Sequence, residues 1–161
     1  MSEFKLAGEI IARSSGANWD EARLEWALDE VYESSEPETC LCGHNPIIEL
    51  CILRNRINGG FATVGNCCVK KFIGLPSDLI FQAGKRVSAD AGRSLNAEAI
   101  AHAFEKGWID AWDRDFYMNV MRKRRLSSKQ RAQKERINLV FVNRMKLAAQ
   151  RASSTAGDGG H

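Results

Sequence analysis

All five cysteines of this 161-residue chain lie between residues 40 and 72, in the stretch CLCGHNPIIELCILRNRINGGFATVGNCCVKKF. An odd number of thiols cannot pair completely in disulfides. The chain has no run of eighteen apolar residues, and its first residues, MSEFKLAGEIIARSSG, include neither a basic leader nor an apolar signal core. We therefore expect a cytoplasmic protein without a membrane partner. In that reducing compartment, thiols serve metal binding, redox chemistry or burial.

The cysteine-rich segment is the part of the sequence that predicts β-strands. IIELCILRNRI is rich in β-forming residues, and FATVG follows as a second strand. Between them, residues 58–59 form the Asn-Gly pair of a tight hairpin turn. With these two as the turn, Cys51 faces Asn66, so the hairpin returns Cys51 beside Cys67 and Cys68.

The cysteine spacing points to zinc. Zinc takes four tetrahedral ligands, commonly Cys or His. Cys40 and Cys42 flank a turn closed by Gly43, and Cys68 follows Asn66, which can cap a helix whose free N–H groups favour a thiolate. We predict a Zn²⁺ site in the order turn, hairpin and helix start, as in a treble-clef finger. The expected ligands are Cys40, Cys42, Cys68 and, as the fourth, Cys51, or else His44 or Cys67.

An alternative leaves the chain without a metal. The C-x-C spacing at residues 40–42 is tighter than the usual C-x-x-C, and the adjacent thiols of Cys67 and Cys68 cannot easily point the same way. In this alternative, Cys51 and Cys67 are small buried apolar residues, as free cysteines commonly are.

The segment also carries a resemblance. CLCGH, ILRNRINGG and VGNCCVKKF look like a small zinc-finger-like, treble-clef-type module of phage, bacterial and large-DNA-virus proteins. Its pattern is C-x-C-G, an Asn-Gly hairpin and then V-G-x-x-C-[VI]-x-K-F, matched over residues 40–72. Cys40, Cys42 and Cys68 occupy its recurring cysteine positions, whereas His44 and Cys67 do not. The resemblance implies a fold for the segment and an origin in a phage or mobile element, without an established activity.

Outside this segment the sequence predicts helices. Residues 4–13 repeat apolar positions at helical spacing, and Asn18 with Glu21 forms a capping box that opens a second helix, through Val31. Ser127 with Gln130 opens a final basic helix. The predicted class is α+β, mostly α, in one compact unit. Its segments are acidic N-terminal helices (1–38), the hairpin module (39–74), a helical region (75–150) and a disordered tail (151–161). The tryptophans are expected in the core: Trp19, Trp26, Trp108 and Trp112.

Charge is distributed unevenly along the chain. Residues 1–50 carry eleven acidic and three basic side chains, while residues 51–161 carry nine and twenty. Residues 122–151 hold eleven Lys or Arg against the single Glu135. Because this bias has one sign, it favours contact with a phosphate backbone over an ordinary solvated helix face. The predicted nucleic-acid-binding residues are Lys70, Lys71, Arg122, Lys123, Arg124, Arg125, Lys129, Arg131 and Lys134.

The sequence lacks the residues that most enzymes would need. Its three histidines are His44, His102 and His161, and Glu49 is the one carboxylate within residues 40–72. The deaminase signature, the phosphate-binding glycine loop and the G-x-S-x-G elbow are all missing. We therefore expect a non-enzymatic zinc-binding accessory protein that binds DNA or RNA. The alternative is a protein-binding adaptor or inhibitor of a host enzyme that uses Glu25, Asp29, Glu30, Glu33, Glu36 and Glu38.

Overall fold

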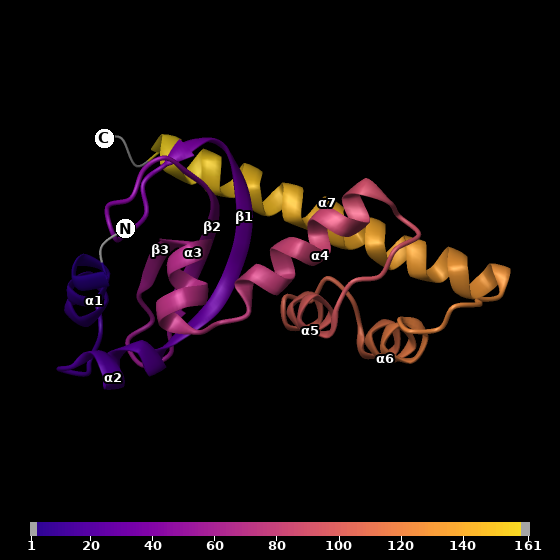
Figure 1. Ribbon diagram of the computed structural model, residues 1–161, viewed down its shortest axis with the longest axis horizontal. Coiled ribbons are helices and arrows are strands. Elements are labelled where there is room, and N and C mark those ends of the chain that lie inside the picture. The colour runs from indigo at the N-terminus through magenta and orange to yellow at the C-terminus, as the bar shows by residue number, and fades with distance from the viewer. Residues whose placement is uncertain (1–2, 159–161) are drawn as a thin grey trace. The chain divides into compact units, whose positions relative to one another are not determined.

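The structure, a computed structural model, describes residues 3–158, with side chains through residue 152. Within this part the chain is mixed α+β, as predicted, with seven α-helices and one three-stranded antiparallel sheet (Figure 1). This part of the chain divides into two compact units. The sheet unit comprises the chain up to Asp78 together with the segment from Ala148 on, and the helical unit runs from Leu79 to Leu147. This grouping differs from the predicted segments, because the last helix contributes to both units.

The sheet unit begins with two helices, only one of which has the predicted length. Helix α1 (Glu3–Ala12) follows the apolar spacing and buries Leu6 and Ile10. The predicted cap is also present, since the side chain of Asn18 accepts a hydrogen bond from the Glu21 N–H at 3.0 Å. Nevertheless α2 (Trp19–Ala22) ends after one turn. A 3₁₀ turn over Arg23–Glu25 follows it.

Strand β1 (Trp26–Glu38) occupies the place of the expected second helix. The prediction of helix over residues 26–31, and of an all-helical segment 1–38, is therefore wrong. A short apolar run fits a helix or a strand equally well, and its tertiary partner decides between them. Here β1 pairs antiparallel with β2 (Ile47–Asn55), with Val31 opposite Cys51.

Strands β2 and β3 form the predicted hairpin in a different register. In β3 (Phe61–Gly65), Val64 lies opposite Cys51, where the sequence predicted Asn66. The turn is longer than two residues, because the Asn55 side chain accepts hydrogen bonds from two turn N–H groups at 2.8 and 3.1 Å. A shift of two residues keeps the same side chains on the buried face, since side chains alternate along a strand.

Two short helical turns follow the sheet. Helix α3 (Asn66–Cys68) starts directly after β3 and bears Cys68, but its N-cap is Gly65. The predicted cap at Asn66 is wrong, because the Asn66 side chain bonds Ser77, Asp78 and Glu49 instead. A π-helical turn over Val69–Ile73 continues it and ends at Gly74, whose φ of +82° is the left-handed conformation that favours glycine.

The last helix, α7 (Ser128–Asp158), is longer than predicted. Its C-terminal part belongs to the sheet unit, where Ala148 packs with Tyr32 and Leu50 of β1 and β2. The partly buried apolar residues around this cluster are Ile47, Ile52, Ala149 and Ala152. Residues 151–158 are helical, so the prediction of a disordered tail is wrong for them. Residues 159–161 of the predicted tail lie outside the described part.

The helical unit consists of helices, as predicted for residues 75–150. It contains α5 (Ala97–Glu105), α6 (Ala111–Val120), the first part of α7 and most of α4 (Ser77–Ala89). The side chain of Asn96 caps α5 at the Ala99 N–H (2.9 Å). The capping box that opens α7 is complete, because Ser127 N–H donates to Gln130 Oε1 at 3.0 Å and Gln130 N–H donates to Ser127 Oγ at 3.1 Å.

The tryptophans divide between core and surface. Trp26 is buried in the sheet unit, and Trp108 packs edge-on against Phe141 (5.6 Å between ring centroids) in the helical unit. Trp112 is 63% exposed and stacks on Phe116 of the same helix, so its predicted place in the core is wrong. Trp19 and Trp108 are half-buried.

Candidate metal centre

The first two thiols lie on a tight turn between β1 and β2. Cys40 N–H donates to the His44 carbonyl at 2.9 Å, and Gly43 N–H donates to the Cys40 carbonyl at 2.8 Å. Gly43 has a φ of +92°, which a residue with a side chain adopts only under strain. This turn buries both Cys40 and Cys42.

Cys68 completes a cluster of three buried thiols. The Sγ atoms of Cys40, Cys42 and Cys68 all lie within 4.8 Å of one another, and they are the one such group of potential metal ligands in the described part of the chain. A tetrahedral site with zinc–sulfur bonds of about 2.3 Å separates its sulfurs by about 3.8 Å. The donor set and its spacing therefore fit zinc, and these three predicted ligands are brought together.

Backbone N–H groups point at the sulfurs. Cys40 Sγ accepts hydrogen bonds from the N–H groups of Cys42 at 3.4 Å and Gly65 at 3.2 Å, and Cys42 Sγ accepts one from His44 N–H at 3.4 Å. Such donors stabilise a thiolate. They compensate charge on two of the three sulfurs that a metal ion would hold as thiolates.

Burial has the opposite effect on the same groups. Burial raises the pKa of the Cys40 thiol, although the Cys42 and Gly65 N–H groups partly offset it. Burial, and then the neighbouring Cys42 and Cys40, also raise the pKa of Cys68. The thiols of Cys40 and Cys68 are therefore disfavoured as thiolates without a metal, so a metal ion that binds them displaces protons.

Cys51 lies apart from the cluster. It is fully buried in β2 and does not line the cavity beside the three thiols. Burial raises the pKa of Cys51 to about 12. These features agree with the alternative in which Cys51 is a small buried residue. For Cys67 that alternative does not hold, because Cys67 is exposed.

A cavity of ≈ 310 Å³ opens beside the three thiols. The other two candidates for the fourth ligand, His44 and Cys67, both line it. Glu49 and Asn66 line it as well. His44 and Cys67 therefore line the cavity beside the three thiols, and Cys51 does not.

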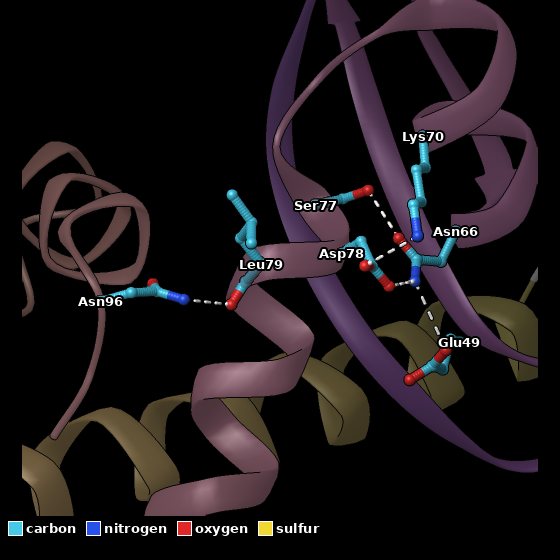
Figure 2. A network of polar contacts seen from close by, with 7 residues as sticks. All are labelled: Glu49, Asn66, Lys70, Ser77, Asp78, Leu79 and Asn96. Atoms are coloured by element: carbon cyan, nitrogen blue, oxygen red, sulfur yellow. Dashed lines mark hydrogen bonds and ion pairs between the residues drawn. The ribbon is translucent and has the colours of Figure 1, made fainter.

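A polar network, which the sequence did not predict, fixes the wall of this cavity (Figure 2). The Asn66 side chain accepts a hydrogen bond from Ser77 Oγ at 2.6 Å and donates to Asp78 at 3.2 Å and to Glu49 at 3.4 Å. Lys70 Nζ lies 3.2 Å from the Asp78 carboxylate. The network therefore joins β2, α3 and the start of α4. Its residues are too far apart in the sequence for a local pattern to reveal it.

The predicted nucleic-acid-binding residues fall on both units. Lys70 and Lys71 are exposed on the sheet unit. Lys134 is only 6% exposed, so it is not offered to a phosphate backbone. The remaining six side chains are exposed on the helical unit, and no described residue forms an ion pair or hydrogen bond with them. They are Arg122, Lys123, Arg124, Arg125, Lys129 and Arg131.

The acidic N-terminal surface is smaller than the sequence indicated. Glu25 is buried, and its carboxylate accepts hydrogen bonds from the N–H groups of Ser15 (2.8 Å) and Gly16 (2.7 Å) and from Asn55 (3.1 Å). The two backbone bonds lower the pKa of Glu25 below its usual value. Glu25 therefore holds the loop before α2 and is not available to a partner.

No protein-family model, curated protein or solved structure matches this chain. In the described part of the chain, no helix combines the length and apolarity needed to cross a membrane.

Proposed function

We propose that this chain is a non-enzymatic, zinc-binding accessory protein that contacts nucleic acid through a basic surface. The zinc site is supported by the cluster of Cys40, Cys42 and Cys68, whose sulfurs have the spacing and the N–H donors that thiolate ligands require. Bound there, zinc would link the turn before β2 to the start of α3. Because a preformed site is absent from an unfolded chain, binding would contribute to folding.

One observation carries the nucleic-acid part of the proposal. Six Lys or Arg side chains within residues 122–131 are exposed and unpaired among the described residues. Four of them lie in the loop before α7, and Lys129 and Arg131 lie in its first turns. Unpaired cations exchange their counterions for phosphates at little cost, which gives binding that weakens steeply with salt.

A salt titration of the full chain against single- and double-stranded DNA and RNA tests this proposal. Replacing Arg122, Lys123 and Arg125 by Ala should flatten the dependence of log affinity on log salt by about two to three units, close to one for each lost phosphate contact. The matched control replaces Arg93, Arg144 and Lys146, which are also two Arg and one Lys exposed on the helical unit. An equal flattening of the salt dependence in both variants would contradict a nucleic-acid-binding surface localised at residues 122–131.

The second candidate is a protein-binding adaptor or inhibitor. It is favoured by β1, an edge strand of the sheet that exposes Glu33 and Glu36. A zinc-loaded protein without affinity for any nucleic acid would favour this function. An origin in a phage or mobile element remains a prediction from the resemblance of residues 40–72.

A further inference from the structure

Three thiols leave one position of a zinc tetrahedron to be filled, and the cavity beside them limits which residue fills it. Protein donors that line the cavity are His44, Glu49, Asn66 and Cys67. Cys51 is not among them. The three thiol residues Cys40, Cys42 and Cys68 line this cavity themselves, so a side chain that also lines it is placed to complete their site.

Two of the four lining donors already have partners. The Asn66 side chain uses its oxygen and its nitrogen in bonds to Ser77, Asp78 and Glu49. Glu49 is held by the same bond to Asn66. Recruiting either residue would break the polar network that supports the cavity wall, which leaves buried groups without partners.

Cys67 is excluded by its position on the helix. Neighbouring residues of a helix do not face the same side. Accordingly, Cys68 is 1% exposed and belongs to the cluster, whereas Cys67 is exposed. Turning the Cys67 thiol toward the ion would rotate α3 and remove Cys68 from it.

We propose that His44 is the fourth ligand, which makes the centre a Cys₃His site. Its backbone N–H already bonds Cys42 Sγ, and its backbone carbonyl accepts from Cys40, so the main chain of His44 is fixed against two of the thiols. Its side chain is exposed and lines the cavity, and no described residue forms a bond with it. The imidazole is therefore free to turn inward.

Charge supports the same choice. Zn²⁺ with three thiolates and a neutral imidazole carries a net charge of −1, whereas a fourth thiolate would give −2. The smaller charge costs less to hold among buried groups. This inference rests on the metal site proposed above and adds the identity of its fourth ligand.

Cobalt(II) bound to the full chain tests the assignment, since its absorption reports coordination number and thiolate count. The wild type should show tetrahedral d–d bands and the charge-transfer intensity of three thiolates. His44→Ala should weaken cobalt and zinc affinity at least tenfold, roughly the lower limit for disturbing a metal site. Free imidazole should restore its spectrum, and His44→Cys should restore affinity with a fourth thiolate's intensity.

Cys67→Ala and Cys51→Ala are the matched controls, and both should keep the wild-type spectrum and affinity. The inference is overturned if His44→Ala behaves as the wild type, or if Cys67→Ala shows the loss instead. A wild-type chain that binds no cobalt and no zinc would overturn the proposed metal site itself. The two failures are therefore distinguishable.

Discussion

The backbone N–H of Gly65 donates a 3.2 Å hydrogen bond to Cys40 Sγ, across 25 positions of sequence. This bond holds the end of β3 against the turn that carries the first two thiols. Cys68, three residues after Gly65, is thereby placed beside them. A Cβ atom at residue 65 would lie 3.1 Å from Ile47 Cδ1 and 3.4 Å from Cys40 Sγ, which explains the glycine.

Gly65→Ala should therefore weaken both folding and metal binding. The added methyl group crowds a buried site, and overpacking typically costs about 1–3 kcal/mol of unfolding free energy. Gly8→Ala is the matched control, because a Cβ there meets nothing and lies within helix α1, where Ala is favoured over Gly by about 0.5–1 kcal/mol. Urea unfolding should show opposite signs for the two variants, and equal signs would contradict the close contact.

Tyr117→Phe should destabilise the helical unit by about 1–3 kcal/mol, because it leaves buried groups unpaired. The Tyr117 hydroxyl donates to Asn138 Oδ1 at 2.6 Å and accepts from Leu95 N–H at 2.8 Å. Asn138 in turn donates to two carbonyls of the loop before α5. A double-mutant cycle with Asn138→Ala should show coupling, whereas additive losses would mean that the hydroxyl bond contributes nothing.

His102 should make the helical unit sensitive to acid. Burial, and then Lys106, lower the pKa of His102 from 6.5 to about 4. The unfolded state therefore binds a proton at a pH where the folded state does not. Stability should fall as the pH drops from about 6.5 to about 4, by at most roughly 3 kcal/mol.

His102→Leu should remove this part of the pH dependence. Comparing its urea unfolding with that of the wild type at several pH values isolates the histidine from the carboxylates, which are common to both proteins. The difference between the two stabilities should be constant above pH 7 and change steadily below it. A difference that stays constant down to pH 4 would contradict the assignment.

Lys134→Met should raise the melting temperature without changing nucleic-acid binding. Lys134 is 6% exposed, and burial lowers its pKa because the charged form loses solvation there. An unbranched apolar side chain of similar length removes this cost. Lys129→Met is the control at an exposed site, and it should leave stability unchanged while weakening nucleic-acid binding.

Local patterns predicted the features that depend on few residues. The caps at Asn18 and Ser127 are present, since each needs only a side chain and a backbone N–H three positions away. The predicted turn at Cys40 and Cys42 is also present, because its conformation depends on the adjacent Gly43.

Features that depend on distant partners were not predictable in the same way. The residues of β1 became a strand because β2 was available to pair with them. The hairpin register followed from the Asn55 side chain, which lengthens the turn beyond its Asn-Gly pair. The predicted register placed Cys51 opposite Asn66, beside Cys67 and Cys68. For this reason the sequence favoured Cys51 as the fourth ligand.

Zinc content of the full chain, purified without chelators, tests the central claim most directly. Elemental analysis should give one zinc per chain in the wild type, in Cys51→Ala and in Cys67→Ala. In Cys68→Ser the same analysis should find no zinc, or much less than one zinc per chain. A wild-type protein without zinc, or a Cys68→Ser variant that keeps it, would contradict a metal centre at Cys40, Cys42 and Cys68.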